Sequence, residues 1–144
     1  MTKTVEFFYD FGSPTVYLAA TQLPAIAGTT GATIDWRPML LGGVFKSTGN
    51  QSPVVVPAKA AHMKDDLERF AKRYGVPFRF NPHFPINTLA LMRGAVAYQD
   101  DAVASSTYRD AIFTAIWVEA RNLNEPEVIG QVLSDAGLDP VELM

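Results

Sequence analysis

Residues 5–19, VEFFYDFGSPTVYLA, contain the junction between a strand and a helix. Residues 5–11 alternate with period two and are rich in aromatic side chains, which predicts a strand that is largely buried on both faces. Gly12 breaks this strand. Ser13 and Pro14 then form a strong helix start, because serine caps helix N-termini and proline favours the first helical position. The stretch predicts a buried strand that passes through a tight turn into a helix.

The next segments complete a strand–helix–strand unit. Apolar residues at helical spacing extend the first helix to Ala27, and Pro24 is predicted to kink or end it. Residues 28–31 are predicted to form a turn. Residues 33–37 form a second predicted strand, which Pro38 closes. This order predicts two parallel strands that are joined by a crossover helix.

The rest of the pattern is helical. Residues 39–57 are rich in Gly, Ser and Pro, which predicts a long connection with about one helical turn. An aromatic and proline-rich loop is predicted at 78–85. Helical periodicity with capping signals predicts further helices over residues 58–74, 87–98, 103–121 and 126–136.

Composition excludes several classes of function. The 144 residues are 48% hydrophobic and carry a net charge of −3, which argues against a nucleic-acid partner. The chain has no cysteine, so disulfides, thiolate metal sites and a cysteine nucleophile are excluded, and two isolated histidines make a dedicated metal site improbable. Without a signal-peptide pattern or a membrane-spanning run, we expect a soluble cytoplasmic protein with no membrane partner.

The final residues predict an incomplete fold unit. Asp139-Pro140-Val141-Glu142 has the pattern of a helix start, with an acidic cap, proline at the first position and glutamate three residues after the cap. Only two convincing strands precede it, and an isolated two-stranded sheet is marginally stable. We expect either a truncated chain or strands that are supplied by another chain.

Ser13 is the first candidate for chemistry. A serine that ends a strand and opens a helix brings its hydroxyl and the free main-chain N–H groups to one spot, which favours an anion. Alternatively, Ser13 is only a helix cap that contributes about 1 kcal/mol of stability. Spacing alone leaves both interpretations open and favours the cap.

Residues 8–19, FYDFGSPTVYLA, resemble the opening motif of the 2-hydroxychromene-2-carboxylate isomerases. These enzymes are relatives of the kappa-class glutathione transferases and have a DsbA-type thioredoxin fold. The resemblance extends in register over essentially the whole chain, through Trp36-Arg37-Pro38, Gly49-Asn50, Val56-Pro57-Ala58-Lys59, Arg73-Tyr74-Gly75-Val76-Pro77 and His83-Phe84-Pro85-Ile86-Asn87-Thr88.

The resemblance implies an α/β, thioredoxin-like fold with an inserted all-helical domain. Residues 1–56 would form the N-terminal part of the thioredoxin-like domain, 57–125 the helical insertion and 126–144 the start of the return. Family members continue with a helix, a loop with a cis-proline, two more strands and a final helix. We therefore expect the C-terminal strands of the thioredoxin domain to be absent from this chain.

The resemblance also implies glutathione as the cofactor, with Ser13 in the place of the first cysteine of the related oxidoreductases. Ser13 would stabilise the glutathione thiolate, and Asn50 would hydrogen-bond the cofactor or substrate. Lys59 would hold a carboxylate of glutathione or of the substrate, and Asn87 would present its amide to the substrate. The alternatives are a turn residue for Asn50, a solvated lysine for Lys59 and a helix cap for Asn87.

The implied reaction interconverts 2-hydroxychromene-2-carboxylate and trans-o-hydroxybenzylidenepyruvate, or isomerises a similar small aromatic electrophile, by reversible thiolate addition. A kappa-class transferase or peroxidase and a non-catalytic DsbA-like binding protein are the alternatives, and the family is often dimeric. Phe78, Phe80 and Phe84 are candidates either for a substrate wall or for loop anchors. We interpret His83 as structural, and both tryptophans, Trp36 and Trp117, as core residues.

Overall fold

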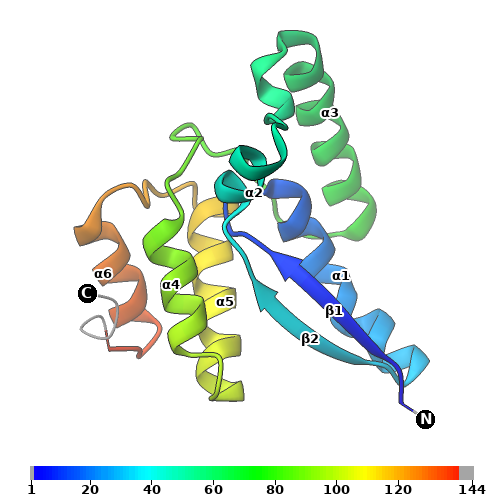
Figure 1. Ribbon diagram of the computed structural model, residues 1–144, viewed down its shortest axis with the longest axis vertical. Coiled ribbons are helices and arrows are strands. Elements are labelled where there is room, and N and C mark those ends of the chain that lie inside the picture. The colour runs from blue at the N-terminus through cyan, green and yellow to red at the C-terminus, as the bar shows by residue number, and fades with distance from the viewer. Residues whose placement is uncertain (1, 140–144) are drawn as a thin grey trace.

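The computed structural model describes residues 2–139, and its elements follow the predicted order (Figure 1). Residues 140–142 of the helix start predicted at 139–142 lie outside the described residues. The elements in chain order are β1 (Thr4–Tyr9), α1 (Pro14–Thr30), β2 (Thr33–Pro38), α2 (Leu41–Thr48), the 3-10 turn η1 (Pro53–Val55), α3 (Pro57–Tyr74), α4 (Leu89–Ala97), α5 (Ala102–Trp117) and α6 (Pro126–Asp135).

The two strands pair in parallel, with Thr4 opposite Thr33 and Tyr9 opposite Pro38. The prediction that the first strand is buried on both faces was wrong. Phe8 is 54% exposed, whereas Tyr9, on the opposite face, is buried. The reason is that the helices pack against the Phe7, Tyr9 and Trp36 side of the sheet and leave the other face to solvent.

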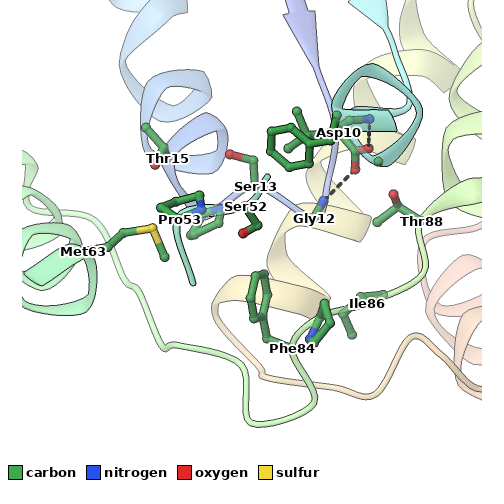
Figure 2. A pocket seen from close by; sticks show the side chains of 15 residues that line it. Asp10, Gly12, Ser13, Thr15, Ser52, Pro53, Met63, Phe84, Ile86 and Thr88 are labelled. Carbon is green, nitrogen blue, oxygen red and sulfur yellow. Dashed lines mark hydrogen bonds between the residues drawn. The ribbon is translucent and has the colours of Figure 1, made fainter. Parts of the chain in front are cut away.

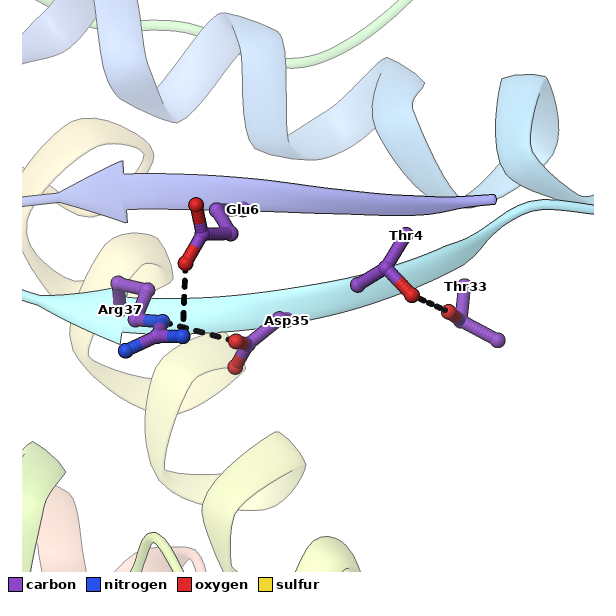
Figure 3. A network of polar contacts seen from close by, with 5 residues as sticks. All are labelled: Thr4, Glu6, Thr33, Asp35 and Arg37. Carbon is purple, nitrogen blue, oxygen red and sulfur yellow. Dashed lines mark hydrogen bonds and ion pairs between the residues drawn. The ribbon is translucent and has the colours of Figure 1, made fainter. Parts of the chain in front are cut away.

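The exposed face of the sheet carries polar cross-strand pairs (Figure 3). The hydroxyl groups of Thr4 and Thr33 are 2.9 Å apart. The Arg37 guanidinium contacts Glu6 at 2.7 Å and Asp35 at 2.8 Å. Because all three charged side chains are exposed, these ion pairs contribute little to stability, but they match the observed strand register.

Helix α1 begins as predicted, with Ser13 as its cap and Pro14 at its first position. Pro24 does not end the helix, which was one of the two predicted effects, because α1 continues to Thr30 and ends at Gly31 in the left-handed conformation (φ 70°). Pro24 lies on the exposed side of α1. Packing of the opposite side against the core holds the helix together despite the missing N–H group.

The connection after β2 is more helical than predicted. It contains α2, which has eight residues and ends at Gly49 (φ 69°), and the short turn η1. Helix α5 is shorter than predicted and ends at Trp117. Its end is set by Ala120 with φ 56° and by the Arg121 N–H, which donates to the Ala115 oxygen at 2.8 Å and turns the chain back.

The core lies between the sheet and α5 and is rich in aromatic rings. Phe11 contacts Phe113 with the ring centres 4.8 Å apart, and both rings are buried. Trp117 is fully buried, which confirms its predicted core position. Trp36 is only partly buried, and the Arg109 guanidinium lies 4.2 Å from its ring centre. Among residues 2–139, no helix is both long enough and apolar enough to cross a membrane.

Candidate functional site

A cavity of about 370 Å³ opens where β1 ends and α1 begins (Figure 2). The strand-to-helix turn forms one wall, and α2, η1, α3 and the loop before α4 form the others. The lining residues are Asp10, Gly12, Ser13, Pro14, Thr15, Leu41, Gly42, Phe45, Ser52, Pro53, Met63, Phe84, Pro85, Ile86 and Thr88. Ser13 and the substrate-wall candidate Phe84 are the sequence-predicted residues among them.

Ser13 holds the first turn of α1 and faces this cavity (Figure 2). Its Oγ atom accepts a hydrogen bond from the Val16 N–H at 3.3 Å, so the predicted cap is confirmed. A hydroxyl has one donor and two acceptor positions, and capping occupies only an acceptor. Among residues 2–139, the hydroxyl hydrogen has no acceptor, and it is available to a ligand at the positive end of α1.

Asp10 fixes the turn that carries Ser13. Its side chain is buried, with 2% of the residue exposed. Oδ1 accepts a hydrogen bond from the Gly12 N–H at 2.9 Å, and Oδ2 accepts one from the Leu41 N–H at 2.8 Å. Sequence analysis missed this residue, although it lies within the strand-to-helix segment at residues 5–19. The signal was present, because aspartate two residues before a turn glycine favours a side-chain bond to the main chain.

The wall opposite Ser13 comes from the loop that follows α3. Asn81, which is 1% exposed, anchors this loop by donating to the Ile116 oxygen at 3.0 Å and the Arg121 oxygen at 2.9 Å. Its own side-chain oxygen accepts a hydrogen bond from the His83 N–H at 2.8 Å. The loop is therefore held by the end of α5, and it presents Phe84 to the cavity.

The three aromatic candidates of this loop divide between the two predicted roles. Phe84 lines the cavity. Phe78 and Phe80 anchor the loop to the core by packing on Trp117. Their ring centres lie 6.1 Å and 6.0 Å, respectively, from the ring centre of Trp117. His83 is exposed and does not line the cavity.

Lys59 lies in the first turn of α3 and is exposed, outside the lining of the cavity. Met63 does line the cavity, one helical turn further along α3. Residues four apart share one face of a helix, so Lys59 lies on the side of α3 that leads to the cavity mouth. The sequence predicts only a helix over residues 58–74, so the place of Met63 in the cavity wall was missed.

The two predicted asparagines lie near the cavity without lining it. Asn50 is exposed and accepts a hydrogen bond from the Gln51 N–H at 2.8 Å. Asn87 is exposed between two lining residues, and its side-chain oxygen accepts from the Leu89 N–H at 3.2 Å, as a capping residue does. The structure therefore brings neither side chain to Ser13.

The lining of the cavity is mostly apolar and contains no Lys, Arg or His among the described residues. Its one charged side chain, Asp10, already accepts two main-chain hydrogen bonds. Within residues 2–139, no group of three or more His, Asp or Glu side chains is placed to hold a metal ion. The arrangement suits an apolar ligand that carries a small anionic atom next to Ser13.

A second cavity of about 370 Å³ lies between α1 and α5, beside Trp36. It contains Arg109, which donates to the Ser105 hydroxyl at 2.7 Å. Burial lowers the pKa of Arg109, and the neighbouring Tyr9 and Asp110 oppose that shift. None of the predicted site residues lies in this cavity.

A family model described as a DSBA-like thioredoxin domain matches residues 4–144 of this chain. The chain belongs to the DSBA-like thioredoxin family. Within this family, it is 37% identical over 145 residues to the 2-hydroxychromene-2-carboxylate isomerase of Sphingobium xenophagum. It is 30% identical to the enzyme of the same name from Pseudomonas putida, and 26% identical to human glutathione S-transferase kappa 1.

Solved structures confirm the thioredoxin-like fold of this family member. A structure of 2-hydroxychromene-2-carboxylate isomerase matches 97% of the chain with a TM-score of 0.83 and 29% identity. A putative protein disulfide isomerase from Nitrosomonas europaea matches the whole chain with a TM-score of 0.65 and 16% identity, which supports the fold alone.

The chain spans only part of these relatives. It covers 71% of the Sphingobium enzyme, 56% of the Pseudomonas enzyme and 64% of the human transferase. It also covers 68% of the solved isomerase chain. The activities of those whole proteins therefore come to this chain only as proposals.

Proposed function

We propose that the chain functions as a glutathione-dependent isomerase that interconverts 2-hydroxychromene-2-carboxylate and trans-o-hydroxybenzylidenepyruvate, or acts on a similar aromatic electrophile. The observation that carries the proposal is the Ser13 hydroxyl, which lies at the start of α1 and lines a largely apolar cavity. The names of the two bacterial relatives at 30–37% identity supply the reaction. The name of the kappa-class relatives supplies glutathione.

The residues present fit the thiol end of glutathione. The chain has no cysteine, so a thiolate at Ser13 must come from a bound molecule. A free thiol has a pKa of about 8.5, and a hydrogen bond to a charged group contributes about 1.5–3 kcal/mol. One donor at Ser13 therefore lowers the thiol pKa by about one to two units, because one unit corresponds to about 1.4 kcal/mol. The positive end of α1 acts in the same direction.

Bound glutathione would supply a thiolate that adds to the conjugated double bond of the substrate and is expelled after rotation about the resulting single bond. The chain contributes the surroundings of that reaction. Ser13 donates its hydroxyl hydrogen to the sulfur and keeps it charged. Phe45, Phe84 and Ile86 give the aromatic ring an apolar wall and exclude water. Lys59, on the face of α3 that leads to the cavity mouth, is proposed to hold a carboxylate, and Asn50 and Asn87 are proposed to assist at the rim.

The test compares Ser13→Ala with Asp101→Ala. Both variants remove a helix cap, since Asp101 caps α5 through hydrogen bonds to Val103 and Ala104, both 3.0 Å long. We expect both to lose about 1 kcal/mol of stability. Only Ser13→Ala is expected to raise the pKa of the bound thiol and to cut glutathione-dependent turnover. The ultraviolet absorbance of the thiolate measures the pKa. Unchanged turnover in Ser13→Ala would remove the proposed role of this residue.

Two measurements separate the alternatives. A kappa-class transferase would act on a halogenated aromatic compound or a hydroperoxide in preference to the chromene carboxylate. The observation that favours this alternative is the 26% identity to the human transferase over 96% of this chain. A non-catalytic binding protein would show no glutathione affinity by calorimetry and no response to Ser13→Ala.

A further inference from the structure

Asp10 connects two parts of the cavity wall that are far apart in the sequence. Its Oδ1 atom accepts a hydrogen bond from Gly12, next to Ser13, and its Oδ2 atom accepts one from Leu41, the first residue of α2 (Figure 2). Both segments line the cavity. One buried carboxylate therefore holds the Ser13 turn and α2 at a fixed separation.

Helix α2 has few other anchors. It buries none of its eight residues, and its cap residue, Leu40, offers no side-chain hydrogen bond. Asp10 supplies the missing cap from a distance of 31 positions in the sequence. A carboxylate at a helix start also compensates the positive end of the helix dipole.

The position of α2 matters to the cavity because three of its residues form one wall, namely Leu41, Gly42 and Phe45. Met63 and Phe84 come from other elements and complete the apolar lining. If α2 moved away, the cavity would lose the Phe45 ring, while Ser13 would keep its place at the start of α1.

We propose that Asp10 is a positioning residue that links α2 to the Ser13 turn through its two hydrogen bonds and thereby shapes the substrate-binding part of the cavity. The arm of the test that measures activity rests on the proposed isomerase function. The arm that measures hydrogen exchange does not, because it reports how readily the α2 amides open to solvent.

The sharpest variant is Leu41→Pro, with Leu41→Ala as its matched control. Both remove the leucine side chain, but only proline removes the N–H group that donates to Asp10. Proline is favoured at the first position of a helix, and Leu40 already has the extended conformation (φ −99°, ψ 102°) that a residue before proline prefers. We expect the α2 amides of Leu41→Pro to exchange at least tenfold faster than those of Leu41→Ala. We also expect the KM for the chromene substrate to be at least fivefold higher in Leu41→Pro than in Leu41→Ala, with kcat within twofold.

A second pair of variants changes Asp10 itself and covers the case in which Leu41→Pro does not fold. Asp10→Asn keeps one acceptor oxygen for Gly12 and places a donor where the Leu41 N–H needs an acceptor. Asp10→Ala loses both bonds. Both remove the same charge, so the difference between them isolates the Gly12 contact. We expect fast α2 exchange and a raised KM in both, and a further fall of at least fivefold in kcat in Asp10→Ala alone. Asp101→Asn, which changes the carboxylate cap of α5 away from the cavity, is expected to leave KM, kcat and α2 exchange unchanged.

The outcomes are distinct. Equal rates of α2 exchange in Leu41→Pro and Leu41→Ala, or a wild-type rate in Asp10→Asn, would overturn the proposal that Asp10 links α2 to the Ser13 turn, whatever the activity. Rapid α2 exchange together with an unchanged KM would show that α2 does not shape the substrate site and would overturn that part of the proposal. If the unaltered chain turns over no chromene carboxylate with glutathione, the proposed function fails. The exchange measurements still decide whether Asp10 links α2 to the Ser13 turn.

Discussion

The indole N–H of Trp117 donates a 2.8 Å hydrogen bond to the main-chain oxygen of Phe11, across 106 positions of the sequence. Both residues are fully buried. Phe11 lies two residues before Ser13, so the last residue of α5 supports the turn that presents the serine hydroxyl. The geometry of the cavity thus depends on a contact between two residues that are far apart in the sequence.

Trp117→Phe removes this hydrogen bond and leaves the Phe11 oxygen buried without a partner. We expect a loss of about 2–4 kcal/mol in the free energy of unfolding, because an unsatisfied buried carbonyl and a small cavity both add to the cost. Urea denaturation followed by circular dichroism measures this loss. A change below about 0.5 kcal/mol would mean that the bond does not support the turn.

Asn81→Ala removes the three side-chain hydrogen bonds that Asn81 makes in the loop carrying Phe84. Two buried main-chain oxygens lose their donor, so we expect a loss of about 2–4 kcal/mol by thermal or urea unfolding. His83→Ala is the control, since that side chain is exposed and its main-chain N–H is retained. We expect the control to stay within about 0.5 kcal/mol of the unaltered protein, and equal losses in both would contradict the anchoring role of Asn81.

Tyr9 gives the protein a dependence on alkaline pH. Burial raises the pKa of Tyr9 from 10.0 to about 12, although the nearby Arg109 opposes the shift. Between these values the unfolded chain releases a proton that the folded protein retains, so stability is lost as the pH rises. We expect the contribution of Tyr9 to the free energy of unfolding to be constant below about pH 10. It should then fall by about 1.4 kcal/mol per pH unit up to about pH 12.

Urea titrations at several pH values test this expectation, with Tyr9→Phe as the comparison. The variant cannot ionise at this position, so its stability should fall less steeply above pH 10. Some decline remains, since burial also raises the pKa of Tyr108. Parallel curves for the two proteins would show that Tyr9 is not the source.

Gly12 has no room for a side chain. A Cβ atom there would lie 3.2 Å from Cγ2 of Thr88 and 3.3 Å from Oδ1 of Asp10. We expect Gly12→Ala to lower stability by about 1–3 kcal/mol and to reduce turnover, because the Ser13 turn must shift. Adding Thr88→Ser removes the methyl group of the first contact and should recover part of the loss.

Gly130→Ala is the matched control for that substitution. Gly130 lies inside α6, and nothing lies within 4 Å of a Cβ atom placed there. Alanine is the better helix former, so this variant should gain about 0.5–1 kcal/mol. Thermal unfolding of the two alanine variants should therefore move in opposite directions, and a shared direction would contradict the close approach at Gly12.

Much of the fold could be predicted from the sequence because its signals are local. Ser13-Pro14 marks the start of α1, and Gly31 and Gly75 stop helices where they adopt the left-handed conformation. These signals depend on a few adjacent residues. The same local reasoning left open whether α1 ends at Pro24, because the packing that carries the helix past the proline is not visible in the local sequence.

The assembled site could be predicted only in part. The cap at Ser13 could be predicted from adjacent residues, its proposed role came from the family resemblance, and the structure places the residue in the cavity lining. The bond from Leu41 to Asp10 links residues 31 apart, and no local pattern states which helix a carboxylate will cap. Phe45 lies in a predicted connection, and an apolar helical residue such as Met63 suits a core as well as a cavity wall, so only the spatial placement of the two residues assigns them to the cavity.

The bond between Trp117 and Phe11 also has a consequence for the protein as it is being made. The strand and the first helix leave the ribosome long before Trp117 is synthesised. Until then the Phe11 oxygen has no indole partner, and the serine turn lacks the support of α5 and of the loop held by Asn81. A nascent chain can therefore form α1 early, yet its ligand-binding cavity is supported only after Trp117 and Arg121 have been translated.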